Sequence, residues 1–325
     1  MRRVGKLSLC VSIVAALAAT MTASAFAQQP EYGRCVAKAV KGGTGYTSSK
    51  CTVATGTKGK YEWLAGPGPQ AGFVSEAKVV YSHDYKLCRT ALFEEEVAKK
   101  ERVEAEGASE PLKGELIERA VEHETNSSDY YRRAEKSRKE CETLVEKEEG
   151  KAPVKLATVG GAHVSCAAEA GSGEYAGPTE VSNVILRLSE CAKKGQACQT
   201  EGAGEGEITT SVLSGRLGVV SDEKGKVKAG LDLQSASAGA FAEFSCEATT
   251  FVLSGSVVHR VSTNKMAKVE LRDFRQKHGM EIPEGFLGEP DFLEASIGGA
   301  APEPIGLEIK DEQISEEKIE VNTAV

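Results

Sequence analysis

The chain has 325 residues, and its 40 lysine and arginine residues are outnumbered by 48 aspartate and glutamate residues, which gives a formal net charge of −8. Binding to nucleic acid or to an anionic membrane surface requires clustered lysine and arginine, and no such cluster occurs, so both functions are disfavoured. The rest of the composition is ordinary for a globular protein, and the length is sufficient for two domains.

Residues 1–27 have the pattern of a secretory signal peptide. A basic start precedes an apolar run from Leu7 to Met21, and Ala25-Phe26-Ala27 fits the small-x-small rule for cleavage. The run is shorter than the roughly 20 residues that a membrane span requires, so an uncleaved anchor is the less favoured alternative. We therefore predict cleavage after Ala27 and a secreted or extracytoplasmic protein with no membrane span after cleavage.

Eight of the nine cysteines lie beyond this segment, since only Cys10 precedes Ala27. An even number of cysteines in an exported chain favours disulfides over metal ligands. No C-x-x-C motif occurs and the five histidines are scattered, so the sequence predicts no metal site and no cofactor. Neighbourhood along the chain and the faces of the predicted strands favour the pairs Cys35–Cys51, Cys88–Cys141, Cys166–Cys246 and Cys191–Cys198.

Residues 28–82 are predicted to form a small β module. The segment is rich in glycine, serine and threonine, contains one predicted disulfide, and is closed by Gly66-Pro67-Gly68-Pro69. Its aromatic side chains allow two interpretations. They are either the core of a small disulfide-stapled module or a surface on which a sugar stacks. The candidate ligand-contact residues are Tyr46, Tyr61 and Trp63.

Residues 83–150 are predicted to form a charged helical hairpin. Apolar residues recur at helical spacing, and Gly107 and Pro111 interrupt the pattern where a turn is expected. Ser127 or Ser128 has the position of a new helix cap, which predicts a kink near Asn126. The hairpin is interpreted as a solvated stalk or lid, with a partner-binding arm as the alternative. The residues of the apolar pattern are Leu112, Leu116, Ile117, Ala120, Val121, Tyr130, Ala134, Cys141 and Leu144.

Residues 151–325 are predicted to form the main β domain, a β-sandwich or barrel-like structure. In the segment Lys226–Leu233 every second residue is apolar, as expected for a half-buried strand. Cys166 and Cys246 each share a strand face with apolar neighbours, so both are expected to point into the core. The same alternation recurs at Val184, Leu186 and Leu188, at Val269 and Leu271, and at Ile305, Leu307 and Ile309.

The main domain contains an internal similarity between residues 207–215 and residues 247–255. In both segments the apolar alternation slips by one position and then meets a glycine, which is typical of a bent or bulged strand. The alternative is a duplicated site in which Glu207 and Glu247 form a carboxylate pair. We favour two similar bent strands, since charged residues are seldom buried without partners.

No catalytic motif stands out. The glycine-rich segment 199–207 carries several glutamates and no lysine, which argues against phosphate binding, and its spacing matches no calcium loop. Nucleophile-elbow, zinc-protease and dinucleotide motifs do not occur. A catalytic triad assembled from distant positions leaves a secreted hydrolase as the alternative function, with no residue assigned to it.

Several short segments of this chain resemble segments of a group of uncharacterised exported proteins of soil actinobacteria. They are Cys166 with Gly173–Pro178, Cys191 and Cys198 with Gly206–Thr210, Leu213–Gly218, Phe244–Cys246, Gly255–Val258, Asn264–Met266 and, nearer the N-terminus, Tyr61–Trp63 with Gly66-Pro67. The resemblance covers most of the chain after the signal except the charged hairpin. It implies that the β domain is a recurrent exported module with no known activity.

These observations favour an exported protein that works outside the cytoplasm or at the cell envelope as a binding or structural module, rather than an enzyme. Its expected partner is a cell-wall glycan or another protein.

Overall fold

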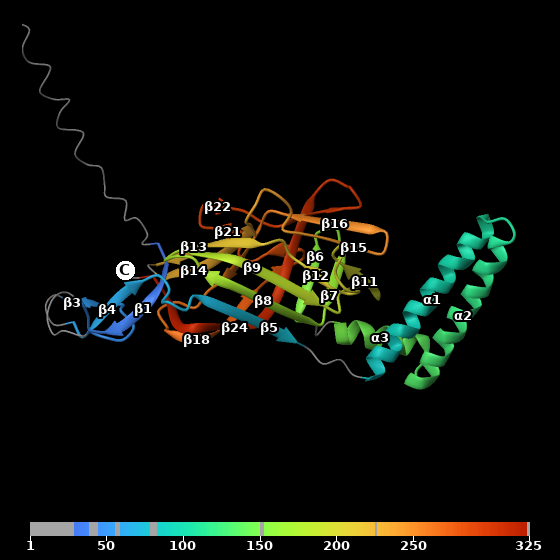
Figure 1. Ribbon diagram of the computed structural model, residues 1–325, viewed down its shortest axis with the longest axis horizontal. Coiled ribbons are helices and arrows are strands. Elements are labelled where there is room, and N and C mark those ends of the chain that lie inside the picture. The colour runs from blue at the N-terminus through green and yellow to red at the C-terminus, as the bar shows by residue number, and fades with distance from the viewer. Residues whose placement is uncertain are drawn as a thin grey trace, which may run out of the picture.

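The computed structural model describes residues 29–38, 45–55, 59–78, 83–149, 153–224 and 226–323. The predicted signal peptide lies outside these residues. The described part of the molecule is elongated, with a small sheet at one end, a strand-rich centre and three helices at the other end (Figure 1).

The centre of the molecule is a closed antiparallel β-barrel, which confirms the mainly β prediction. Each strand pairs with the next in the order given below, and the last returns to the first. Closure removes free sheet edges and distinguishes this barrel from a two-sheet sandwich. The strands are β5 (Gly72–Lys78), β8 (Ala168–Tyr175), β9 (Glu180–Ser189), β13 (Leu213–Glu223), β14 (Lys226–Ser235), β17 (Ser256–Arg260), β18 (Ala267–Phe274) and β24 (Glu303–Asn322).

A second circuit of strand pairings extends the barrel at its helical end. It begins and ends on the first part of the long strand β24, whose later part belongs to the barrel. One continuous cluster of buried side chains fills both circuits. The additional strands are β6 (Val154–Thr158), β7 (His163–Cys166), β10 (Ala192–Lys193), β11 (Gln196–Gln199), β15 (Ala242–Cys246), β16 (Thr249–Ser254) and β23 (Glu294–Ile297).

The N-terminal sheet closes the other end of the barrel. Its strand β1 pairs with β4 and also with residues 320–322 of β24, so it is joined to the barrel by main-chain hydrogen bonds. Strand β5, which lies inside the predicted 28–82 module, is a barrel strand and not part of this sheet. The strands of the sheet are β1 (Glu31–Ala37), β2 (Gly45–Tyr46), β3 (Ala54–Thr55) and β4 (Tyr61–Ala65).

Five short strands complete the β structure. β12 extends the pairing of β9, and the other four form two hairpins between β18 and β23. The ring of Phe286 lies against Gly218 of β13, so this excursion covers part of the barrel wall. The strands are β12 (Ile208–Thr209), β19 (Gln276–Lys277), β20 (Met280–Glu281), β21 (Gly285–Phe286) and β22 (Glu289–Pro290).

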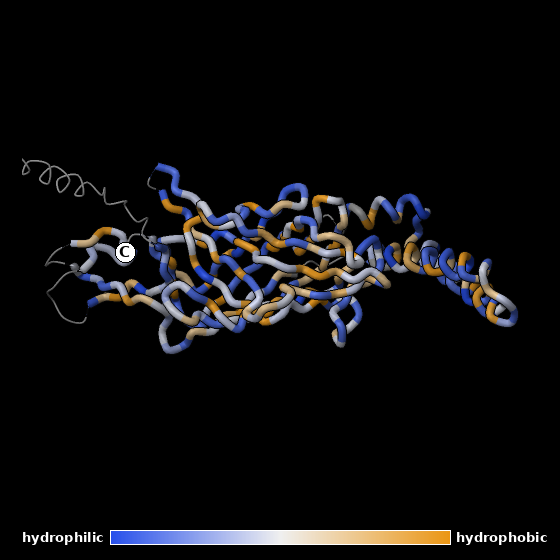
Figure 2. The backbone as a smooth tube through the Cα atoms, turned by 90° about the horizontal axis from the view of Figure 1, so that it is seen from above, coloured by the Kyte–Doolittle hydropathy of each residue, from blue (hydrophilic) through white to orange (hydrophobic). Residues whose placement is uncertain are grey.

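Along most barrel strands, buried and exposed residues alternate as the sequence pattern predicts, and Figure 2 shows the hydropathy of each residue along the same chain path. In β14, Ala229, Leu231 and Leu233 are buried in the core, as predicted. In β18 the prediction is wrong. Val269 and Leu271 are 49% and 70% exposed on the outer wall, because the strand turns Glu270 and Arg272 inward.

The two similar segments are bent strands, as favoured from the sequence. β16 belongs to the second circuit and β17 to the barrel, and Gly255 between them has a φ of 95°, which an L-residue adopts only with strain. In the first copy the pairing with β9 shifts between Leu213 and Gly215. The glutamates serve different contacts: Glu207 accepts a hydrogen bond from Gly204 N, and Glu247 pairs with Lys100 of α1.

The helical segment forms an arm of three helices, α1 (His83–Gly107), α2 (Leu112–Ala134) and α3 (Arg138–Glu149). The predicted antiparallel hairpin is α1 with α2. The predicted kink near Asn126 is wrong, since α2 continues through it and Ser127 donates to the carbonyl of Ala91.

The chain breaks instead after Ala134. Ser137 and Glu140 exchange hydrogen bonds, with distances of 2.8 Å from Ser137 N to Glu140 Oε2 and 3.4 Å from Glu140 N to Ser137 Oγ. This reciprocal arrangement is a capping box, and it starts α3.

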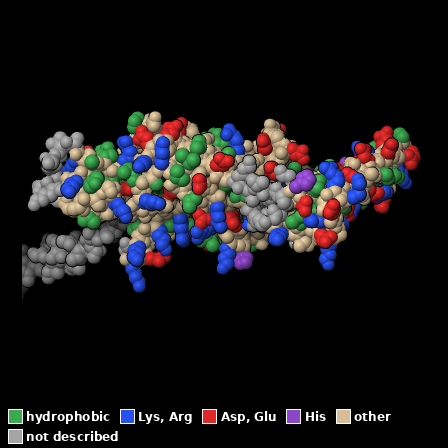
Figure 3. Space-filling model, turned by 90° about the horizontal axis from the view of Figure 1, so that it is seen from below, with side chains coloured by type: hydrophobic (Ala, Val, Ile, Leu, Met, Phe, Trp, Pro, Cys, Tyr) green, Lys and Arg blue, Asp and Glu red, His purple; other side chains and the backbone are tan. Residues whose placement is uncertain are grey.

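Mostly small side chains form the contact between α1 and α2, among them the buried Ala91, Ala98 and Ala105 of α1. Leu116 and Ala120 are buried, whereas Leu112, Ile117 and Val121 of the predicted apolar pattern are 52%, 39% and 48% exposed. Acidic and basic side chains crowd the arm's surface (Figure 3). No helix in the described ranges has the length and apolar character needed to cross a membrane.

Four disulfides join cysteines of the described residues, and two of them pair as predicted: Cys35–Cys51 and Cys88–Cys141. The other two are Cys166–Cys191 and Cys198–Cys246, so the predicted pairs Cys166–Cys246 and Cys191–Cys198 are wrong. All four cysteines point into the core, and pairing was decided by strand register. Cys198 lies directly opposite Cys246, with their Cα atoms 4.1 Å apart, and the Cα atoms of Cys166 and Cys191 are 4.0 Å apart.

Candidate binding site at the mouth of the barrel

The interior of the barrel becomes polar toward the N-terminal sheet. Antiparallel pairing brings β5, β8, β18 and β24 together, and the residues that these strands turn inward are mostly charged or hydroxylated. This polar side of the interior consists of Ser75, Glu169, Tyr175, Glu270, Arg272, Asp311, Gln313 and Ser315.

Arg272 is the centre of this group and is only 2% exposed. Its Nε donates to Asp311 Oδ1 at 2.8 Å, and a second nitrogen bonds the other carboxylate oxygen, which makes the pair bidentate. The same guanidinium donates to Glu169 Oε1 at 3.3 Å, and Ser75 Oγ donates to that oxygen at 2.8 Å. Two buried carboxyls therefore share one buried cation.

Burial and the neighbouring Asp311 carboxylate raise the pKa of Glu169 to about 7, against the opposing effect of Arg272. A protonated Glu169 makes the cluster neutral, which lowers the cost of keeping it away from water.

A hydroxyl network lies between this cluster and the barrel mouth. The hydroxyls of Tyr175 and Ser315 are 2.8 Å apart, and Gln313 Nε2 donates to the Tyr175 oxygen at 2.8 Å. The ring of Tyr32, from β1, packs edge-on against Tyr175 with centroids 4.8 Å apart. Burial and the nearby Tyr175 and Glu270 raise the pKa of Tyr32 well above its usual value, so its hydroxyl stays protonated.

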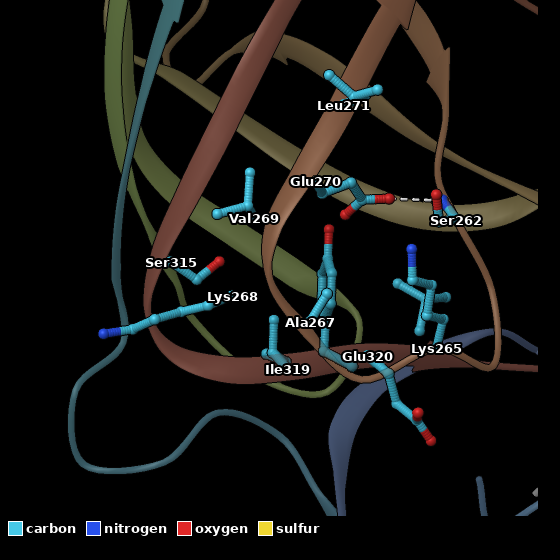
Figure 4. A pocket seen from close by; sticks show the side chains of 12 residues that line it. Ser262, Lys265, Ala267, Lys268, Val269, Glu270, Leu271, Ser315, Ile319 and Glu320 are labelled. Atoms are coloured by element: carbon cyan, nitrogen blue, oxygen red, sulfur yellow. Dashed lines mark hydrogen bonds between the residues drawn. The ribbon is translucent and has the colours of Figure 1, made fainter.

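A pocket of about 260 Å³ opens beside Tyr32 (Figure 4). Its walls combine apolar side chains with hydroxyls and charged groups, as is common for small-ligand sites. The lining residues come from β18, from the last part of β24, from the segment before β18 and from β1. They are Tyr32, Ser262, Lys265, Ala267, Lys268, Val269, Glu270, Leu271, Ser315, Ile319, Glu320 and Val321.

Glu270 is the carboxyl that faces this pocket. It accepts a hydrogen bond from Ser262 N at 2.5 Å, and Lys265 extends toward the same side (Figure 4). Burial raises the pKa of Glu270, while Ser262, Arg272 and Lys265 oppose the increase. The site therefore offers a carboxyl, an ammonium group and hydroxyls within one small opening.

Glu320 also lines the pocket, but its carboxyl points away from Glu270 (Figure 4). The residue is only 3% exposed. Burial raises its pKa to about 7, opposed by Lys50 and the main-chain amide of Met266. The two carboxyls do not converge on one point, as the acid and base of a glycosidase would.

The predicted ligand-contact residues lie together but outside this pocket. Tyr46 is directly opposite Tyr61, and Trp63 lies two positions along β4, so all three share one face of the N-terminal sheet. All are half-buried, the indole of Trp63 packs over Gly33, and its Nε1 donates to Glu31. The three rings pack within the sheet, as core residues do, and each keeps an exposed part, as ligand-contact residues do.

Sequence reasoning missed the mouth pocket because its residues are spread over the chain. The one available signal was in β18, where Glu270 and Arg272 alternate with Val269 and Leu271. That pattern is compatible with either face pointing inward, and the general preference for burying apolar side chains predicts the face of Val269 and Leu271. No group of three or more potential metal ligands occurs among the described residues, and none of the histidines lines this pocket.

Comparison with protein families, with curated proteins and with solved structures finds no match to this chain. The resemblance to exported actinobacterial proteins stays a prediction.

Proposed function

We propose that the protein is an exported binding module of the cell envelope and that the pocket at the barrel mouth holds a small hydroxylated group of its ligand, such as one sugar unit. The observation that carries this proposal is the pocket itself, in which Glu270, Ser262 and Tyr32 meet above a filled barrel core. Hydroxyl, carboxyl and apolar surfaces side by side suit a polyol, which presents both polar edges and C–H faces.

The four disulfides support work in an oxidising compartment, where such bonds persist. They cross-link the N-terminal sheet, the base of the arm and the second circuit.

The test is binding of the purified protein to cell-wall glycan, measured as the fraction that pellets with the insoluble polymer. Ala267→Trp fills the pocket, and Glu270→Gln removes its charge without changing its shape. Both are expected to weaken binding roughly tenfold, as when one well-placed polar contact is lost. Ala301→Trp is the matched control, because Ala301 is exposed in the turn between β23 and β24, in the second circuit rather than at the mouth.

Unchanged binding by both pocket variants would refute the mouth as the site. If only Trp63→Ala lost binding, the binding site would instead lie on the aromatic face of the N-terminal sheet.

A secreted hydrolase is the second candidate, on one observation: two carboxyls with raised pKa values, Glu270 and Glu320, line the same pocket. Their divergence favours binding over catalysis. Release of new reducing ends from the glycan by the wild-type protein, and not by Glu270→Gln, would establish the hydrolase instead.

A further inference from the structure

A larger groove lies at the opposite end of the barrel, between the helical arm and the second circuit. Its cavity volume is about 730 Å³. One wall is formed by α1 and α3, and the other by two turns, Gly160–His163 and Lys193–Gly195. It shares no residue with the pocket at the barrel mouth.

The carboxylates on the helical wall are already engaged. Glu95 accepts from Lys99 Nζ and from Arg138 Nε, both at 2.9 Å. Glu142 pairs with Arg138 at 3.1 Å, and Glu96 accepts a hydrogen bond at 3.2 Å from a glutamine of β11. None of the three is a free acceptor for a cationic ligand.

Five cationic side chains line the groove against these three carboxylates. Lys99 and Arg138 pair with carboxylates of the groove, which leaves Arg89, Lys193 and Lys194 as the other three cations. No ion pair joins any of these three to a residue in the described part of the chain, and Lys193 instead lies 5.2 Å from the centre of the Phe251 ring. The groove is therefore locally positive in a chain whose net charge is −8.

Lys193 and Lys194 line this groove and not the hollow on the other side of α1, whereas Arg89 lines both. That separate hollow, of about 450 Å³, is lined by Glu94, Glu190 and Glu205, and Arg89 stands between the two. His163 adds no charge near neutrality, since desolvation and Lys155 lower its pKa. An anion is thus directed toward the two lysines rather than toward the acidic hollow.

The helical wall between the charged groups is apolar. Leu92 and Val145 line it, and Val145 is 8% exposed, while Ala162 lies in the facing turn. We propose that this groove binds an organic anion, whose apolar body packs on Leu92 and Val145 and whose carboxylate or phosphate group is held by Lys193, Lys194 and Arg89.

The proposal is tested on the full chain by ligand-observed NMR and calorimetric titration. The probes are hexanoate and hexyl phosphate, which carry both features, inorganic phosphate, which lacks the apolar body, and hexylammonium, which reverses the charge. Hexanoate or hexyl phosphate is expected to bind more tightly than inorganic phosphate, and the tighter of the two identifies the anionic group. Hexylammonium is expected not to bind.

The double variant Lys193→Gln/Lys194→Gln is expected to bind the hexyl anion roughly tenfold more weakly, since two charges are lost from a partly solvated site. Lys226→Gln/Lys277→Gln removes the same charge at exposed positions outside the groove and is expected to leave affinity unchanged. Equal loss in both variants, equal binding of hexylammonium, or no binding of either hexyl anion would overturn the proposal. Because the mouth-pocket variants do not touch this groove, either proposal can fail alone.

Discussion

The two halves of strand β24 show two different interiors in one molecule. In the first half the inward residues are Ile305, Leu307 and Ile309, which are at most 2% exposed and pack in the common apolar core. In the second half the residues of the same parity are Asp311, Gln313 and Ser315, which are equally buried and join the polar cluster. Strand alternation fixes which residues share a face, but the side chains of the neighbouring strands decide whether apolar or polar residues are stable on that face.

The outer wall around the polar half is correspondingly apolar. Val74 is directly opposite Ile314, and Ile314 is directly opposite Val269, so the three form a row across β5, β24 and β18. Their side chains are 54%, 46% and 49% exposed. Apolar side chains are therefore exposed here beside the charged Glu76 and Glu312, because β18 turns Glu270 and Arg272 inward.

The largest expected effect comes from removing the buried cation. Arg272→Met leaves Asp311 and Glu169 buried without their counter-charge and is expected to lower the free energy of unfolding by about 3–5 kcal/mol. Arg275→Met, on an arginine whose side chain is 59% exposed, is the control and should cost less than about 1 kcal/mol. Urea denaturation measures both. A loss of similar size in the two variants would contradict the central role of Arg272.

A large-to-small substitution, which leaves a cavity, tests the apolar half of the barrel interior. Leu233→Ala, at a residue 1% exposed, is expected to cost about 2–5 kcal/mol in the same denaturation experiment, through lost burial and the void that remains. Unlike the arginine change, this loss should not vary with pH, because no ionisable group is involved. A strongly pH-dependent loss would show that the two halves are not energetically separate.

The polar half should carry a pH dependence of its own. The folded-state pKa of Glu169 is about 7, above the ordinary carboxyl value of 4.5, so the folded state holds the proton more tightly than the unfolded state. Its contribution to stability is complete below about pH 4.5 and is lost as pH rises through 7. Glu169→Gln cannot ionise and should reduce this loss by about 2 kcal/mol between pH 5 and 8, at 1.36 kcal/mol per unit of pKa shift.

Glu174→Gln, at an exposed position on the same strand, is the control for this change. Urea midpoints across the pH range provide the measurement. Glu281, whose pKa burial raises to about 9, adds a decline that also begins above about pH 4.5 but continues to about pH 9, so Glu169→Gln removes only part of the total. Identical pH profiles for wild type and Glu169→Gln would mean that Glu169 is not the titrating group.

The smallest effect is expected on the outer wall. Leu271→Ala, at a residue 70% exposed, should change the free energy of unfolding by less than about 0.5 kcal/mol, although the sequence pattern alone treats Leu271 as equivalent to Leu233. Comparing the stability losses of Leu271→Ala and Leu233→Ala therefore tests directly whether β18 turns its apolar residues outward. A loss near that of Leu233→Ala would indicate that β18 pairs with its charged residues outward.

The sequence by itself determined the mainly β class, the inserted helical arm, the inward direction of Cys166 and Cys246 and the bends near Gly215 and Gly255. Each depends on local properties: the period of apolar residues, the conformational range of glycine, and the concentration of charge in the arm. The two short-range disulfides that were predicted correctly also join neighbours within one small unit.

Only the tertiary structure decided closure into a barrel, the partners of Cys166 and Cys246, and the inward face of β18. These depend on the register between strands that are distant in sequence. One position of slip exchanges Glu270 and Arg272 for Val269 and Leu271, and the choice is made by Asp311 and Glu169 on other strands. The mouth pocket and the cationic groove likewise exist only where separate segments meet, which no local pattern records.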